Sequence, residues 1–221
     1  MTRHHPPALI ETIRVRNGTA PLWYLHLRRL ALSCKALGIP LPGELPPPEQ
    51  GPDRVHRLEV GMRGVQVSER LVGPSTPVRL IISRVGHHPY VHKTTERAQF
   101  DRALDTARGA EADDALLLTP GGYVAETAIF SVLWWEDGTL CAPALHLGVL
   151  PGVGRARVTE LVDGVEERHA TWPELRGRSL FLVNSVRGIV KVSAVQDDRV
   201  PTSRHTDELA ARFWPEPAPI A

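Results

Sequence analysis

The first half of the chain shows a pattern of apolar and polar residues that predicts one helix and several strands. Residues 8–15, ALIETIRV, are apolar and β-branched and precede an Asn-Gly turn signal, so they predict a strand. Residues 24–39 place apolar side chains at near-helical spacing, which predicts an amphipathic helix. After a proline-rich loop, further strands are predicted at 55–60, 65–72 and 78–83. A helix packed on a small, largely antiparallel sheet is an α+β arrangement.

The second half alternates strand and helix patterns and predicts a larger unit. A connector at 84–92 leads to a helix at 95–109, and a long apolar run at 123–135 predicts a single strand. The remaining expected elements are strands at 114–119, 137–144 and 165–170, and a strand, a turn and a second strand over 179–195. A glycine-rich loop entering a helix at 148–162, a short helix after 170, and a helix at 205–214 are also expected.

Composition narrows the class of protein. The 221 residues carry a net charge of +1, which does not favour nucleic acid as a partner. The two cysteines are far apart and form no CxxC motif, which favours a reducing cytoplasm. The sequence shows neither an apolar run of the ~20 residues that a membrane span needs nor a signal-peptide pattern. We therefore expect a cytoplasmic protein that does not bind a membrane.

Two charged residues lie at unusual places. Lys93 falls at the predicted junction between the connector and the next helix, where an exposed lysine is the ordinary expectation. Glu126 interrupts an otherwise apolar run, and a carboxylate buried without a partner is unfavourable. Glu126 can face water from one side of a strand, or it can pair with a buried cation. The pattern alone leaves both interpretations open.

Three segments could bind an anion. The loop GVLPGVGRAR at 148–157 leads directly into a helix, whose first N–H groups favour phosphate, although a plain glycine turn is the alternative. It matches neither a Walker A loop nor a dinucleotide fingerprint. Arg28 and Arg29 lie on the first helix, where they can face solvent or reach an anion. The turn NSVRG at 184–188 can present N–H and hydroxyl donors.

His87, His88 and His92 fall in the predicted connector. No carboxylate or further histidine has a spacing that indicates a metal site, so we expect surface histidines and no bound metal. A lysine, an isolated acid, a phosphate-type loop, an arginine and a polar turn are together what pyridoxal 5'-phosphate requires, because this cofactor needs an amine, a carboxylate for its ring nitrogen and a phosphate anchor.

Six segments, in order, resemble the fold-type IV pyridoxal-phosphate enzymes, the class IV aminotransferase family: ETIRV, HLRRL, HKTTER, DDALLLTPGGYVAET, GVLPGVGRARV and FLVNSVRGI. KTTER, NSVRG and the early IETIRV are most similar to the aminodeoxychorismate lyase branch. The resemblance implies an α+β, two-domain fold. Residues 1–86 would form a small α/β domain, residues 87–92 a connector, and residues 93–221 a larger, β-barrel-like cofactor domain.

The resemblance also implies a role for each matching position. Lys93 would bind pyridoxal 5'-phosphate as a Schiff base and move the proton, Glu126 would keep the ring nitrogen protonated, and Arg29 would bind the phosphate. Other cofactor contacts would come from the N–H groups of Val153 and Gly154 and from Asn184 and Ser185. Thr12, Arg14 and Arg187 would face the substrate. The chain departs from the family at Gly154, where Thr is common, and at Ser131, where Asn is usual.

The implied activity is that of 4-amino-4-deoxychorismate lyase, which forms 4-aminobenzoate and pyruvate for folate biosynthesis. A class IV aminotransferase acting on branched-chain or D-amino acids is the first alternative, and a non-catalytic paralogue that has lost the cofactor is the second. The family forms homodimers around small-molecule substrates, so we expect a homodimer.

Overall fold

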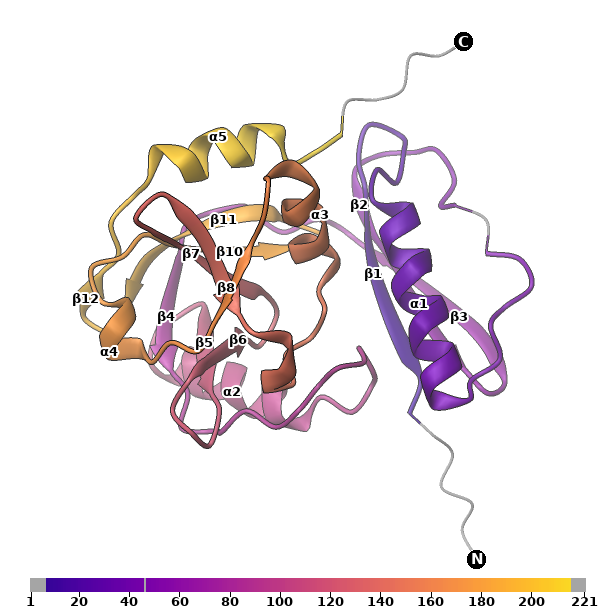
Figure 1. Cartoon of the computed structure of the whole chain (residues 1–221). Helices are drawn as coiled ribbons and strands as arrows, with labels where there is room; N and C mark the ends of the chain where they lie inside the picture. Colours follow the sequence, from indigo (N-terminus) through magenta and orange to yellow (C-terminus); the bar gives the residue numbers. More distant parts are fainter. Residues whose placement is uncertain (1–6, 46, 216–221) are drawn as a thin grey trace, which may run out of the picture. The chain divides into compact units, whose positions relative to one another are not determined.

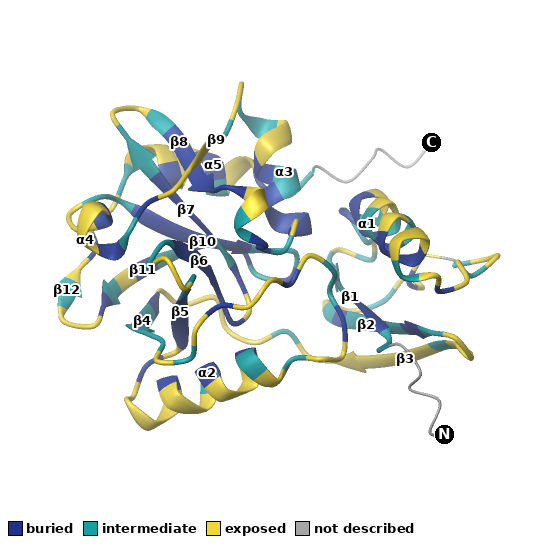
Figure 2. Ribbon diagram, turned by 60° about the horizontal axis from the view of Figure 1, so that its bottom comes forward, coloured by how far each residue is buried: buried dark blue, intermediate teal, exposed yellow. Residues whose placement is uncertain are grey.

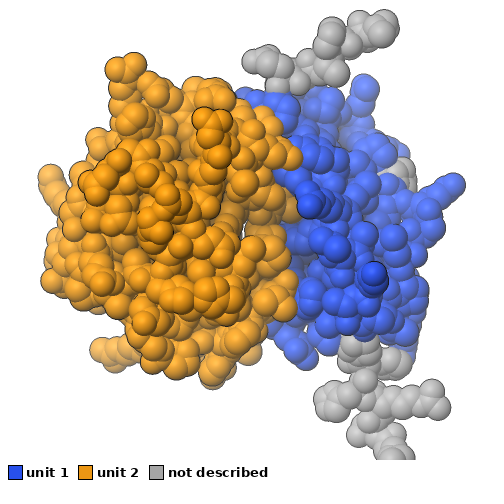
Figure 3. Space-filling model, in the orientation of Figure 1, with its two compact units in different colours: residues 1–73, 92–96, 214–221 blue, residues 74–91, 97–213 orange. Residues whose placement is uncertain are grey.

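The computed structural model describes residues 7–45 and 47–215. The chain divides into two compact units, which are described separately below (Figure 3). Unit 1 contains residues 1–73, 92–96 and 214–221, and unit 2 contains residues 74–91 and 97–213. Relative to the expected division at 86 and 93, the segment 74–86 packs with unit 2, and Lys93 with its neighbours packs with unit 1.

Unit 1 is an antiparallel sheet with one helix. Its strands follow the order β1 (Leu9–Val15), β2 (Arg54–Gly61) and β3 (Gly64–Arg70), and the helix is α1 (Trp23–Leu37). Ile13, Leu30 and Leu58 belong to the apolar core of this unit. Helix α1 ends at Gly38, whose φ of 66° is left-handed and therefore suits glycine. The helix and strands expected from the sequence in this region are confirmed.

The segment 92–96 runs along the edge of β1. The carbonyl of Lys93 accepts a hydrogen bond from the Ile10 N–H at 2.7 Å, and the Thr95 N–H donates to Ala8 at 2.9 Å. Because Thr94 and Thr95 follow β1 in this way, helix α2 (Ala98–Gly109) starts three residues later than expected. Lys93 therefore has a fixed backbone position within unit 1.

Unit 2 is built on a nine-stranded mixed sheet. Along the sheet the strands are β6 (Val124–Thr127), β5 (Asp114–Leu118), β4 (Val78–Ile82), β11 (Gly188–Val195), β10 (Leu180–Asn184), β7 (Ser131–Glu136), β8 (Thr139–Pro143) and β9 (Glu166–Arg168), with β12 (Asp198–Arg199) paired to β11. Strand β6, at one end of this order, also contacts β7 and β8, so the sheet curls toward a half-barrel (Figure 1).

The helices of unit 2 are α2, α3 (Val153–Leu161), α4 (Trp172–Leu175), α5 (Arg204–Arg212) and a 3₁₀ turn at Leu145–Leu147. Strands β7 and β10 are largely buried, whereas α2 buries one face and exposes the other (Figure 2). Among the described helices, none is both long and apolar enough to cross a bilayer.

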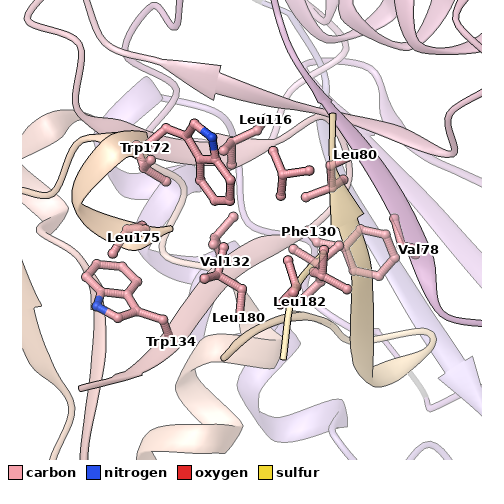
Figure 4. Packing of buried hydrophobic residues seen from close by; sticks show 14 of the residues in the cluster. Val78, Leu80, Leu116, Phe130, Val132, Trp134, Trp172, Leu175, Leu180 and Leu182 are labelled. Carbon is pink, nitrogen blue, oxygen red and sulfur yellow. The ribbon is translucent and has the colours of Figure 1, made fainter. Parts of the chain in front are cut away.

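The largest core cluster of unit 2 lies on one face of the curled sheet. Side chains from β4, β5, β7 and β10, together with Trp172, point toward one another in this cluster (Figure 4). Trp134 and Leu116 are completely buried. Each side chain of this size contributes roughly 1.5–3 kcal/mol when it is removed from water, so the cluster fixes the strands that carry the site.

Two predictions about strands were wrong. The segment 78–83 was assigned to the small antiparallel sheet, but β4 pairs in parallel with β5 and β11 in unit 2. Apart from Arg79, its residues are apolar, as is typical of a buried parallel strand. The run 123–135 was assigned to a single strand, but a turn divides it, because the Thr127 N–H donates to the Phe130 carbonyl at 3.0 Å and the two halves pair with different strands.

Candidate functional site

Glu126 lies on β6 with a side chain that is only 7% exposed. Its Oε1 is 2.9 Å from His87 Nε2 and accepts a hydrogen bond from the Leu150 N–H at 3.3 Å. Within residues 7–45 and 47–215, Oε2 has no hydrogen-bond partner, and it keeps some contact with solvent. The interpretation that Glu126 faces water is therefore wrong, because the side chain is buried beside His87. The alternative interpretation, that Glu126 pairs with a buried cation, stays a prediction.

The hydrogen-bond partner of Glu126 is a histidine expected at the surface. His87 is buried, with 1% of its area exposed, because the connector does not pass over the surface at this point. Its backbone N–H donates to the Leu118 carbonyl at 2.8 Å and so ties the connector to the end of β5. His88 is exposed as expected, and His92 is half-buried with Nδ1 3.0 Å from Ser33 Oγ. The expectation of surface histidines thus fails for His87.

The first turn of α3 presents free amides. The carbonyl of Gly152 accepts the Ala156 N–H at 2.9 Å, which starts the helix. In the part of the chain that the structure describes, the N–H groups of Val153 and Gly154 have no acceptor. Such groups, at the positive end of a helix dipole, bind anions when a ligand reaches them.

Gly154 lets this helix end approach the turn after β10 closely. A Cβ at this position would lie 2.8 Å from Asn184 Cα and 2.9 Å from its carbonyl carbon, so no side chain fits there. Asn184 in turn holds its own turn closed, because its Oδ1 accepts the N–H groups of Val186 at 2.9 Å and Arg187 at 2.7 Å. The structure therefore brings the first turn of α3 against the backbone of Asn184, where the threonine that the resemblance leads one to expect would not fit.

Arg29 lies in a buried charged cluster of unit 1. Its Nε and Nη2 donate to the two oxygens of Glu11 at 2.9 and 2.5 Å, and His26 Nδ1 is 2.6 Å from Glu11 Oε2. Burial alone would raise the pKa of Glu11, but the charge of Arg29 and the hydrogen bonds from His26 and Arg29 lower it to about 2. Burial lowers the pKa of His26, and the nearby charges of Arg29 and Lys93 lower it as well. Lys93 therefore lies close enough to this cluster for its charge to act on His26.

The three expected substrate-facing residues lie in different surroundings. Thr12 and Arg14 lie two residues apart on β1, and Arg14 Nη2 is 2.5 Å from Asp53 Oδ2. Arg187 donates to the Thr76 carbonyl at 2.8 Å and lies 5.3 Å from the Phe130 ring. Each of the two arginines has a buried Nε with no acceptor among the described residues.

Sequence reasoning missed Glu11, His26 and His87. A signal for Glu11 existed, since it interrupts an apolar β-branched strand in the same way that Glu126 interrupts its run. The histidines had no comparable signal, because their burial depends on segments that are distant in sequence.

The arrangement resembles known proteins in both sequence and fold. A family model described as amino-transferase class IV matches residues 66–195. A protein of Schizosaccharomyces pombe named "Putative aminodeoxychorismate lyase" is 28% identical over 186 residues, which are 75% of this chain and 80% of that protein. An aminodeoxychorismate lyase of Vibrio harveyi is 22% identical over 232 residues, covering 84% of this chain and 82% of that protein.

Among solved structures, a fold IV transaminase from Curtobacterium pusillum matches with a TM-score of 0.78 and 23% identity, over 94% of this chain and 86% of that one. The branched-chain amino acid aminotransferase of Escherichia coli matches with a TM-score of 0.82 and 17% identity, over 95% of this chain and 85% of that one. At these identities the likeness shows the fold, and the predicted fold-type IV architecture is confirmed.

Proposed function

Because this chain belongs to the amino-transferase class IV family, we propose that it is a pyridoxal-phosphate-dependent 4-amino-4-deoxychorismate lyase that forms 4-aminobenzoate and pyruvate. Both curated relatives described above carry the name aminodeoxychorismate lyase, and KTTER and NSVRG resemble that branch. The observation that carries the cofactor assignment is the geometry of Glu126, a buried carboxylate with one oxygen engaged and the other without a partner.

The residues of unit 2 fit pyridoxal 5'-phosphate. Oε2 of Glu126 is an acceptor suited to a protonated ring nitrogen, and the free amides of Val153 and Gly154 suit a phosphate dianion. Asn184 and Ser185 would complete the phosphate contacts from the turn that packs against Gly154. Arg29 stays proposed as a phosphate ligand through Nη1, the nitrogen that it does not use on Glu11.

When bound, pyridoxal 5'-phosphate supplies an electron sink for negative charge on a substrate carbon. The Lys93 amine would remove the proton from the ring carbon that carries the substrate nitrogen, while Glu126 keeps the proton on the cofactor's ring nitrogen. The bond between the neighbouring ring carbon and the enolpyruvyl oxygen would then break, the departing enolpyruvate would take up a proton to become pyruvate, and the ring would become aromatic. Arg14 or Arg187 would bind the substrate carboxylates, and Thr12 would assist from the same strand as Arg14.

The chain offers a clean test of the lysine, because it has only three: Lys35, Lys93 and Lys191. Lys35 is exposed on α1, and Lys191 pairs with Asp207 at 2.5 Å. Borohydride reduction after addition of pyridoxal 5'-phosphate, followed by peptide mass spectrometry, should place the adduct on Lys93. Lys93→Ala should abolish the visible absorbance of the bound cofactor, whereas the control Lys35→Ala should retain it. An adduct on Lys35 or Lys191 alone would refute the assignment.

The lyase and the aminotransferase differ in products. Incubation with aminodeoxychorismate should release 4-aminobenzoate and pyruvate in equal amounts. The runner-up activity predicts that amino acids convert the bound cofactor to pyridoxamine phosphate, which keto acids restore, with no 4-aminobenzoate formed. That second result would reject the lyase proposal in favour of an aminotransferase. A protein that binds no cofactor would indicate the non-catalytic paralogue. We also propose a homodimer in the cytoplasm, as the family resemblance implies.

A further inference from the structure

We infer that His87 is a positioning residue for Glu126, holding one carboxylate oxygen so that the other is left for the ring nitrogen of the cofactor. The inference rests on the proposed function and adds to it a residue that none of the six sequence motifs contains. His87 lies on the connector between β4 and Lys93, six positions before the lysine. The contact joins two buried side chains that lie 39 residues apart in the sequence.

The backbone fixes where the imidazole can go. The His87 N–H donates to Leu118 at the end of β5, the strand that pairs with β6 and so with the segment that carries Glu126. On the other side of His87, the Tyr90 N–H donates to the Gly148 carbonyl at 2.7 Å, which holds the connector beside the glycine-rich loop. With both ends of this stretch anchored and the ring buried, the imidazole has little freedom to leave Glu126.

The hydrogen-bond partner determines which ring nitrogen of His87 donates. A carboxylate oxygen can only accept, so Nε2 must carry the proton that bonds Oε1 at 2.9 Å. His87 Nδ1 is buried and has no partner among the residues described. Nε2 of His87 is therefore the nitrogen that carries the proton of this hydrogen bond.

The two oxygens of Glu126 consequently have different environments. Oε1 accepts from both His87 and the Leu150 amide, whereas Oε2 accepts from no described residue. Without the His87 donor, the ionised carboxylate would lose one of its two hydrogen bonds and would be free to rotate. His87 thus acts on the cofactor through Glu126 and touches neither substrate nor reacting atoms.

Three variants separate this role from simple packing. His87→Leu removes the donor at similar volume, His87→Gln can return an N–H donor, and His88→Leu changes the exposed neighbour as a control. We expect His87→Leu to raise the dissociation constant of pyridoxal 5'-phosphate by about tenfold or more, as the loss of a hydrogen bond to a charged group predicts. His87→Gln should recover most of this loss, and His88→Leu should match the wild type.

Nitrogen NMR of the cofactor-free wild type gives a readout independent of activity. We expect His87 to be protonated at Nε2, and Glu126→Gln to shift the Nε2 resonance. A ring without a proton on Nε2 would overturn the inference, and so would a His87→Leu variant that binds the cofactor normally while Glu126→Gln does not. If the wild type binds no cofactor, the proposed function fails and the positioning role fails with it. If the wild type binds the cofactor and only the prediction for His87→Leu fails, the proposed function stays intact.

Circular dichroism of each variant checks folding, and the wild-type NMR result does not depend on any variant.

Discussion

Asp114 is a completely buried carboxylate at the start of β5, and its burial predicts a measurable pH dependence of stability. Its Oδ1 accepts the N–H groups of Ala115 at 2.7 Å and Ala128 at 3.1 Å, whereas its buried Oδ2 has no hydrogen-bond partner among the described residues. Asp114→Asn keeps the oxygen that both amides need and removes the ionisable group. The substitution therefore isolates the cost of ionising this side chain.

The size of that cost follows from the pKa. Burial raises the pKa of Asp114 from 3.8 to about 6, although its side-chain and backbone hydrogen bonds lower it in part. Because the folded pKa lies above the unfolded one, the unfolded chain releases its proton first, and the wild type loses stability as pH rises from about 4 to 6. A shift of about two pKa units corresponds to about 3 kcal/mol, of which about 2 kcal/mol falls between pH 4 and pH 8.

Urea unfolding of the wild type and Asp114→Asn at several pH values tests this reasoning. The buried amide of Asn has a constant cost, so the quantity to follow is the difference in unfolding free energy between the two proteins. That difference should grow by about 2 kcal/mol in favour of Asn between pH 4 and pH 8. Asp137→Asn, in an exposed turn whose φ of 49° suits Asn, should show no such trend. A difference that stays constant with pH, or grows toward acid, would refute the argument.

Two further predictions concern Glu11 and Gly154. The pKa of Glu11 is lowered from 4.5 to about 2, so its contribution of about 3 kcal/mol is present above pH 4.5 and is lost as pH falls toward 2. Glu11→Gln should therefore be less stable than the wild type at pH 7 in urea, with a gap that narrows at pH 3. Gly154→Ala should lower stability by about 1–3 kcal/mol and weaken cofactor binding, because the new Cβ meets the Asn184 backbone. Thermal unfolding should show no comparable loss for Gly164→Ala, where a Cβ meets nothing within 4 Å.

The sequence predicted those helices and strands that are determined by local residue patterns. The helix at 24–39 and the strand at 8–15 followed from apolar spacing and from their turn residues, Gly38 and Asn17-Gly18. The two errors concern pairing: β4 was given to the wrong sheet and 123–135 was not divided. Which strand a segment joins depends on contacts with strands far along the chain, such as β11, and local propensity does not encode these.

Single residues of the candidate site were likewise predictable only where their local sequence gave a signal. Glu126 was noticeable because a carboxylate in an apolar run needs an explanation, and the structure supplied His87 as its partner. The burial of His87 could not be predicted, since its neighbours in sequence are glycine, histidine and proline, as in an ordinary surface connector. In the structure its backbone N–H donates to the Leu118 carbonyl at the end of β5, a contact with a segment distant in sequence.

Glu11, Asp114 and Glu126 show how the partners of a buried carboxylate distinguish structural from functional roles. Both oxygens of Glu11 are occupied by Arg29 and His26, so it has no acceptor left for a ligand. Asp114 has an unoccupied oxygen, but that atom is sealed from solvent and no ligand can reach it. Glu126 alone among these three combines a fixed oxygen with one that is both unoccupied and accessible. Burial by itself does not separate the three acids, whereas the partners and accessibility of their individual oxygens do, and these distinguish Glu126, the acid that we propose as the cofactor ligand.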